Sequence, residues 1–147
     1  MAGNLQNLPQ PGILTELLSI LFPLRCAHCG RAGNWLCDEC AEQLRPIGPA
    51  ICRRCGRPLP ASMPDCPECR GRELQFDRAR AAFCFDGPAR SLVHRLKYSG
   101  QRRLASFMAD LSLEAMADLT ENCERVNLTS VPLHSSKLVS RGYNQAG

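Results

Sequence analysis

The sequence predicts a mixed α and β protein in two parts, and three observations lead to this prediction. Four Cys-x-x-Cys pairs stand close together between Cys26 and Cys69, which is typical of a small metal-binding module. After this module the composition changes, and segments with the alternation of strands follow among segments with helical spacing. The 147 residues are enough for one ordinary domain or two small ones.

The four pairs predict two structural zinc sites. One Cys-x-x-Cys turn presents two sulfurs to one ion, so a zinc ion held by four thiolates needs two such turns. The eight expected ligands are Cys26, Cys29, Cys37, Cys40, Cys52, Cys55, Cys66 and Cys69. Sequential pairing joins the first pair to the second and the third to the fourth. The spacing alone leaves the crossed pairing, first with third and second with fourth, open as well.

Other uses of these cysteines are disulfides and an iron–sulfur cluster. The N-terminal residues do not combine a basic start, an apolar stretch and a small-residue cleavage site, as a secretory signal would. We therefore expect a cytoplasmic protein, in which paired cysteines bind metal rather than form disulfides. No run of the sequence is long and apolar enough to predict a membrane span.

The pairs differ in the residues that come after them. Gly30 and Gly56 each follow a pair directly, as in a zinc knuckle, where glycine relieves the tight turn. Cys37 and Cys40 run into good helix formers, so we expect them at the start of a helix, which favours thiolate. The sequence therefore repeats a knuckle and a second pair twice.

The charge balance does not by itself indicate a nucleic-acid partner. The formal net charge is +4, but eight thiolates and two Zn²⁺ ions together would bring the loaded chain close to zero. Arg53, Arg54 and Arg57 are expected to neutralise a four-thiolate centre or to lie on a solvated face. A contact with nucleic-acid phosphates is the alternative interpretation of these three arginines.

Periodicity predicts the other elements. We expect helices over residues 13–22, 89–98 and 103–119, because apolar residues recur there at helical spacing. Strands are expected over residues 76–85 and 126–133.

Two stretches resemble a known family. His94-Arg-Leu-Lys-Tyr98, followed by Gly100, resembles the characteristic helix of the ComF family, also described as ComFC/GntX-like proteins. Val131-Pro-Leu-His134 and then Arg141-Gly-Tyr-Asn-Gln145 resemble the VPL…RGFNQ signature of that family, with tyrosine in place of phenylalanine. The four cysteine pairs resemble its double zinc ribbon, and the order of these motifs along the chain is also that of the family.

The resemblance implies a double zinc ribbon joined to a type I phosphoribosyltransferase-like α/β domain with a parallel sheet. The expected division is an N-terminal tail and short helix over 1–25, the double ribbon over 26–73, and the N-terminal part of the transferase-like domain over 74–147. Such domains bind phosphoribosyl pyrophosphate with Mg²⁺. Several family members are tied to natural competence and DNA uptake, so the DNA-uptake machinery and single-stranded DNA are the implied partners.

The resemblance also implies that Arg141, Gly142, Asn144 and Gln145 line the pyrophosphate side of the site. Arginine suits phosphate as a planar fork of donors, and glycine allows close backbone approach. From the residues alone, the same stretch is a polar surface loop.

One expected motif is absent. The phosphoribosyl pyrophosphate loop, with two acidic residues, two spacers and Thr-Thr-Gly, does not occur in the sequence. A doubly wound sheet also needs several βα units, more than residues 74–147 supply. We therefore expect a C-terminally truncated member that alone does not bind phosphoribosyl pyrophosphate, and its status as an enzyme stays open. The alternative is a zinc-ribbon adaptor that binds protein or single-stranded DNA.

Overall fold

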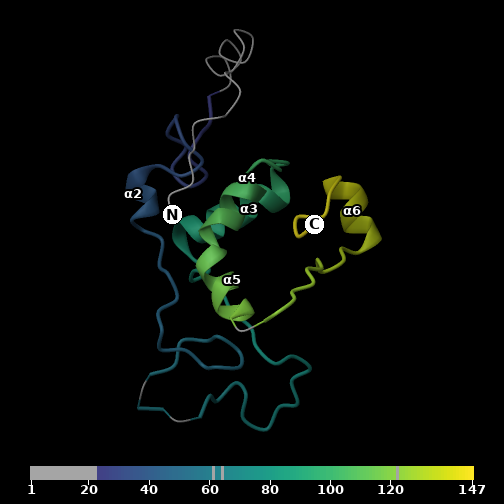
Figure 1. The fold of residues 1–147 in the computed structure, drawn as a ribbon. Helices are drawn as coiled ribbons and strands as arrows, with labels where there is room; N and C mark the ends of the chain where they lie inside the picture. Colours follow the sequence, from purple (N-terminus) through teal and green to yellow (C-terminus); the bar gives the residue numbers. More distant parts are fainter. Residues whose placement is uncertain (1–22, 61, 64, 122) are drawn as a thin grey trace.

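The computed structural model describes residues 23–60, 62–63, 65–121 and 123–147 (Figure 1). The helix expected over 13–22 lies outside the described residues. The helices in the described part are α2 (Asp38–Ala41), α3 (Gly87–Tyr98), α4 (Leu104–Leu111), α5 (Leu113–Thr120) and α6 (Ser135–Arg141). Regular strands are not found among these residues. Their β structure is limited to isolated antiparallel bridges between Arg25 and Ala32, Pro46 and Phe83, and Ile51 and Pro58.

The prediction of regular strands over residues 76–85 and 126–133 is therefore wrong. Residues 76–85 run as irregular chain and pair with the segment before the second ribbon half only locally, where Ile47 N–H donates to the Ala82 carbonyl at 2.9 Å. Residues 126–133 are irregular too, without a ladder partner in the described chain. The parallel sheet of the expected α/β part is not seen in these residues, so that part of the fold remains a prediction.

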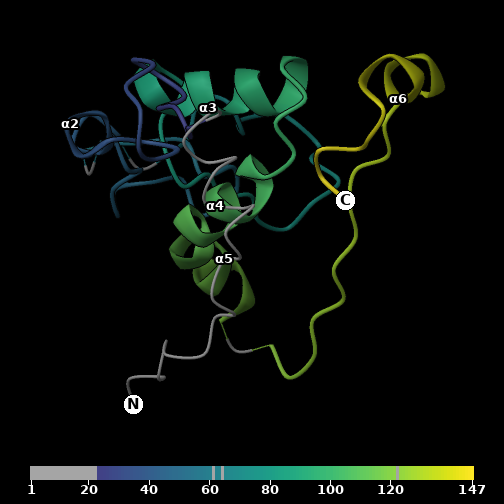
Figure 2. The same ribbon diagram turned by 90° about the horizontal axis from the view of Figure 1, so that it is seen from above.

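The core joins the first cysteine pairs to the helices. Leu92 and Leu96 on α3 and Leu104 on α4 are buried in one cluster with Cys26, Ala27, Leu36, Cys37 and Cys40. Trp35 packs against this cluster. Figures 1 and 2 show α3 beside the first cysteine segment from both directions. The first ribbon half is thus part of the same core as α3 and α4.

The helix expected over 103–119 is interrupted. α4 ends at Leu111 and α5 begins at Leu113, with Ser112 between them at φ −101° and ψ 0°. The Ser112 hydroxyl donates to the Met108 carbonyl at 2.8 Å, and such back-bonding by serine bends helices. The helix expected over 89–98 is confirmed, because α3 spans Gly87–Tyr98.

The end of the chain is held by Tyr143 against α3 and the turn between α3 and α4. Its hydroxyl donates to the Leu96 carbonyl, and the Arg102 guanidinium lies 4.6 Å from its ring centre. His134 caps α6 by accepting a hydrogen bond from Ser136 N–H, and Gly142 ends that helix with φ 77°. α6 was not predicted from the sequence, and the stretch that was expected to be a surface loop follows this helix from Gly142.

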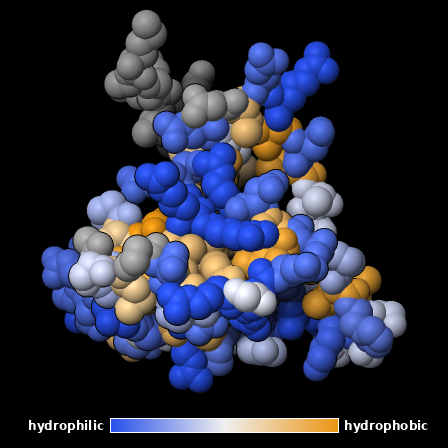
Figure 3. Space-filling model, turned by 90° about the horizontal axis from the view of Figure 1, so that it is seen from below, coloured by the Kyte–Doolittle hydropathy of each residue, from blue (hydrophilic) through white to orange (hydrophobic). Residues whose placement is uncertain are grey.

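Several apolar side chains of the last segment face solvent. Leu128, Val131 and Val139 are each at least three-quarters exposed. On the face drawn in Figure 3, hydrophobic groups reach the surface in separate places among hydrophilic ones. None of the helices in the described ranges combines the length and the apolar character that crossing a membrane requires.

Candidate metal centres

The first candidate centre is built from two turns. Cys26 N–H donates to the Arg31 carbonyl at 2.7 Å, and Gly30 N–H donates to the Cys26 carbonyl at 3.0 Å, which closes the knuckle. Gly30 has φ 82°, as the sequence predicted for a glycine after a tight turn. Cys37 precedes α2 as its N-cap residue, so the expected placement of this pair at a helix start is confirmed.

The second candidate centre repeats the first knuckle. Cys52 N–H donates to the Arg57 carbonyl at 2.8 Å, and Gly56 N–H donates to the Cys52 carbonyl at 2.9 Å. Gly56 has φ 71°. Its second pair is held by a turn in which Cys69 N–H donates to the Cys66 carbonyl at 3.1 Å. The internal repeat of the sequence is therefore a repeat of local structure.

The sulfurs gather in two groups of four that follow the sequential pairing. Cys26, Cys29, Cys37 and Cys40 form one group, and Cys52, Cys55, Cys66 and Cys69 form the other. Within each group all sulfurs lie within 4.8 Å of one another. The crossed pairing would need sulfurs from both groups at one ion, and this arrangement is not what the structure has.

The distances fit tetrahedral zinc. With Zn–S bonds of about 2.3 Å, a tetrahedral ion places its sulfurs about 3.8 Å apart. The Sγ–Sγ distance is 3.6 Å between Cys29 and Cys37. In the second group it is 3.8 Å between Cys52 and Cys69 and 3.7 Å between Cys55 and Cys66. Both groups therefore fit structural zinc sites with four sulfur ligands.

The backbone favours a thiolate at the first cysteine of each group. Burial raises the pKa of Cys26, but the N–H groups of Cys29, Cys37 and His28 outweigh it and lower the pKa to about 6. The N–H groups of Cys55 and Arg54 likewise lower the pKa of Cys52 to about 6.

The last cysteine of each group has the opposite bias. Burial, and then the neighbouring sulfurs, raise the pKa of Cys40 and of Cys69 to about 12. The protein therefore favours a thiolate at the first cysteine of each group and disfavours one at the last, so the expectation that the helix start favours thiolate is not met at Cys40. A divalent cation at the centre supplies the charge that allows the remaining thiols to ionise together.

The two centres are attached to the rest of the chain in different ways. The first lies in the core described above. The second packs against the segment after the ribbon, where Ala79 N–H donates to the Arg54 carbonyl at 2.7 Å. A Cβ atom on Gly56 would meet the Ala79 carbonyl oxygen at 2.4 Å, whereas one on Gly30 would meet nothing within 4 Å.

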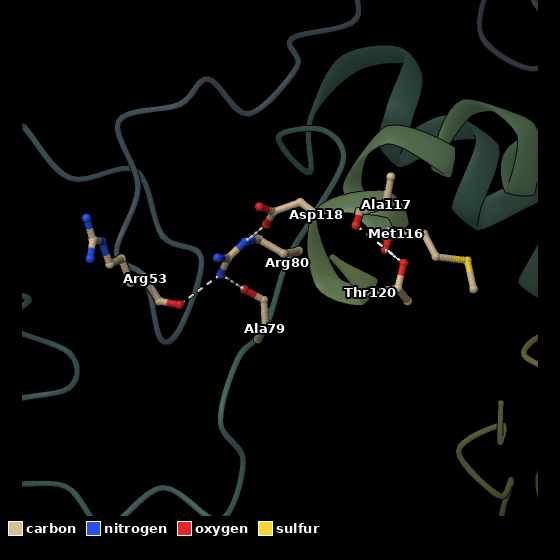
Figure 4. Close-up of polar contacts among 7 residues, drawn as sticks. All are labelled: Arg53, Ala79, Arg80, Met116, Ala117, Asp118 and Thr120. Atoms are coloured by element: carbon tan, nitrogen blue, oxygen red, sulfur yellow. Dashed lines mark hydrogen bonds and ion pairs between the residues drawn. The ribbon is translucent and has the colours of Figure 1, made fainter. Parts of the chain in front are cut away.

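Arg80 connects the second centre to α5 (Figure 4). Its guanidinium donates to the Arg53 carbonyl at 3.0 Å and to the Ala79 carbonyl at 2.9 Å, and it pairs with Asp118 on α5. The side chain is only 9% exposed. Sequence reasoning missed this contact, because the pattern that predicted a strand over residues 76–85 did not indicate that an arginine within it would be buried.

The three arginines of the second knuckle are exposed. Arg57 pairs with Glu68 at 3.2 Å, and Arg54 donates to the Leu74 carbonyl at 2.8 Å. Arg53, Arg54 and Arg57 thus lie on a solvated face, which was one of the two expected placements.

The residues expected on the pyrophosphate side lie together at the end of α6. The Arg141 guanidinium donates to the Gln145 side-chain oxygen, and the Asn144 amide donates to the Val131 carbonyl at 3.0 Å. Gly142 is the residue between α6 and this turn. Tyr143, which the sequence did not single out, is the residue that holds the turn to α3.

Comparisons with known proteins agree with this geometry. Residues 17–84 match the family model for the double zinc ribbon domain. The DNA utilization protein YhgH of Salmonella typhimurium strain LT2 is 30% identical over 130 residues, which cover 85% of this chain and 54% of that protein. YhgH of Escherichia coli K12 is 28% identical over 128 residues, with the same shares covered.

The chain thus spans about half the length of these curated relatives, and no solved structure matches it. We conclude that the N-terminal part of the chain is a double zinc ribbon domain and that the chain is similar, well beyond this domain, to proteins named for DNA utilization.

Proposed function

We propose that the chain is a ComF-like double-zinc-ribbon protein that acts in the uptake or use of DNA. The similarity to the relatives named for DNA utilization supports this role, because it extends over 85% of the chain and not over the ribbon alone. In this proposal the two ions are structural. Each is held by four sulfurs, in the sequential groups that begin at Cys26 and at Cys52.

The role in DNA use can be tested in the source cells. A strain that lacks the chain should incorporate less label from externally supplied DNA than its parent does. A plasmid copy should restore incorporation, and a copy with both Cys26→Ser and Cys52→Ser should not. Unchanged incorporation in the deletion strain would contradict the proposed role of this chain in DNA use. We propose a cytoplasmic location, which fractionation of cells carrying a tagged copy would test.

The second part of the proposal concerns residues 74–147, taken as the first portion of a phosphoribosyltransferase-like domain after a tail over 1–25 and a ribbon over 26–73. The motif of α3 and the turn after α6 support it, because Lys97 and Tyr98 share a hollow of about 300 Å³ with Lys137 and Arg141. The chain lacks the acidic-acidic-x-x-Thr-Thr-Gly loop. We therefore expect no useful binding of phosphoribosyl pyrophosphate by this chain, and Mg²⁺ would matter only in a family member that has this loop.

Titration calorimetry tests this expectation. The 147-residue chain, loaded with zinc, should give no saturable heat with phosphoribosyl pyrophosphate and Mg²⁺ at micromolar concentrations. Saturable, Mg²⁺-dependent binding would contradict the expectation. If binding occurs, Arg141→Ser should weaken it and Arg103→Ser should not.

A second candidate function is that of an adaptor whose ribbon binds protein or single-stranded DNA. The exposure of Arg53, Arg54 and Arg57 on one knuckle favours it, because phosphates or acidic side chains can reach these guanidinium groups, of which Arg57 also pairs with Glu68. The triple substitution of these arginines by serine should abolish such binding. Binding equal to that of the parent would refute a role for this knuckle.

A further inference from the structure

A basic hollow lies between the first cysteine knuckle and α3. Its volume is about 560 Å³. The described residues that line it include two arginines, two histidines and a tyrosine, without an aspartate or glutamate: Ala27, His28, Gly87, Arg90, Ser91, His94, Arg95, Tyr98 and Ser99. A hollow of this composition attracts an anion, because its cations are not neutralised by carboxylates in the wall.

Two of the residues that line this hollow, His94 and Tyr98, carry aromatic rings, and the ring of Phe85 lies next to His94 outside the lining. The ring centres of Phe85 and His94 are 6.2 Å apart, and those of His94 and Tyr98 are 5.6 Å apart in an edge-to-face arrangement. Phe85 is 63% exposed and Tyr98 is 72% exposed. Rings that served only the core would be covered by other side chains, so these two offer free faces to a partner.

Tyr98 also lines the smaller hollow, of about 300 Å³, that it shares with Lys97. That hollow contains Lys97, Lys137 and Arg141, and the Arg141 guanidinium lies 5.6 Å from the Tyr98 ring centre. The described lining of the smaller hollow also lacks a carboxylate. An exposed ring therefore stands between two cationic hollows.

The platform under these rings is rigid. Arg95 Nε–H donates to the Ala27 carbonyl at 3.0 Å, and His28 and Ser91 share a hydrogen bond of 2.9 Å. Both contacts tie α3 to the first knuckle. Leu92 and Leu96 on the same helix are buried in the core. A ligand would therefore not have to order this surface when it binds, which lowers the entropic cost of binding.

We propose that this surface, defined by Phe85, Arg90, His94, Lys97 and Tyr98, binds single-stranded nucleic acid. A base stacks on the exposed face of Tyr98, and the backbone phosphates on either side lie near Arg90 and Lys97. Alternating aromatic faces and cations are the chemistry by which proteins hold single strands without reading their sequence. This inference rests on the proposed role in DNA use, and it assigns the contact to α3 rather than to the arginines of the second knuckle.

Fluorescence anisotropy of a labelled oligothymidine with the zinc-loaded full chain tests the proposal. Tyr98→Ala should raise the Kd about 5- to 150-fold, as expected from loss of one base–aromatic stack. Tyr98→Phe keeps the ring and should bind like the parent. Arg90→Ser should weaken binding and lower the slope of log K against log salt by about 0.7, the value for one phosphate contact on a single strand.

Arg103→Ser is the matched control, because Arg103 is exposed and lines neither hollow. It removes the same charge and should change the Kd little. Each variant should retain the zinc content of the parent, which separates a lost contact from a lost fold.

The outcomes separate the two ideas. If the parent binds and the α3 variants bind equally well, the site on α3 is refuted while a DNA-binding role stands. Loss of binding only in the Arg53, Arg54 and Arg57 triple variant would place the contact on the second knuckle instead. If the parent does not bind the oligonucleotide at all, both nucleic-acid proposals fail, whereas the incorporation assay still tests the role in cells.

Discussion

The two knuckle glycines offer a matched pair of substitutions with different expected costs. Gly30 and Gly56 occupy the same turn position and have similar left-handed φ values of 82° and 71°. Alanine in this conformation costs about 1–2 kcal/mol at either position, because Cβ approaches the following carbonyl oxygen. This shared term makes Gly30→Ala the control for the backbone effect.

Gly56→Ala has a second cost that Gly30→Ala lacks. The new Cβ would lie 2.4 Å from the Ala79 carbonyl oxygen and 3.3 Å from the Arg80 Cα, and both are backbone atoms that cannot rotate away. The segment would have to move, which strains the hydrogen bond from Ala79 N–H to the Arg54 carbonyl. Forced overpacking of this kind costs about 1–3 kcal/mol. The total is therefore about 2–5 kcal/mol, against about 1–2 kcal/mol for Gly30→Ala.

Competition with a chromogenic zinc chelator measures the difference. The expected gap of about 1–3 kcal/mol corresponds to a roughly 5- to 150-fold greater loss of zinc affinity at the second centre of Gly56→Ala than at the first centre of Gly30→Ala. Equal losses in the two variants, or a greater loss in Gly30→Ala, would refute the assignment of Gly56 as a point of close backbone approach.

Three further predictions concern the metal groups and the core. Cys52→Ser should reduce the zinc content measured by elemental analysis from two ions to one. Cys123→Ser is the control, because Cys123 lies outside both groups, and it should keep two ions; loss of both ions in Cys52→Ser would show that the centres are coupled. Leu104→Ala should lower the free energy of unfolding, measured with denaturant at fixed free zinc, by about 2–5 kcal/mol, because this side chain is fully buried. Val139→Ala is the control, because Val139 is highly exposed, and an equal loss in this variant would refute the place of Leu104 in the core. Arg80→Met should lower the free energy of unfolding by about 1–3 kcal/mol, because it leaves two backbone carbonyls without their donor. It should also speed proteolysis around residues 74–80, and unchanged proteolysis would contradict the role of Arg80 in connecting the second centre to α5.

Features set by local chemistry could be predicted from the sequence. The Cys-x-x-Cys spacing and the following glycine determine the knuckle turns, since one short turn must present two sulfurs and then reverse with positive φ. The sequential grouping was the simplest of two open pairings, and the structure has that one. α3 was also predictable, because Leu92 and Leu96 recur on one face and Gly100 follows the helix.

Features that depend on partners far along the chain could not be predicted. Alternation suggested strands over 76–85 and 126–133, but a strand needs a ladder partner, and sequence alternation does not reveal whether one is present. The break at Ser112 depends on a side-chain bond to Met108 that competes with the helix. The burial of Arg80 depends on carbonyls from the second knuckle and a carboxylate from α5, and these come together only in the folded chain.

The difference in how the two cysteine groups are attached has a consequence for the lifetime of a bound ion. Three of the four ligands of the first group, Cys26, Cys37 and Cys40, are buried in the cluster around Leu104, so complete release of an ion from this group needs that cluster to open, which is a sub-global unfolding event. An ion held by the second group could leave when residues 74–80 and Arg80 release the knuckle, which is a local opening of lower free energy. Two sites that each have four sulfur ligands would therefore exchange isotopically labelled zinc at different rates, with the second site faster than the first.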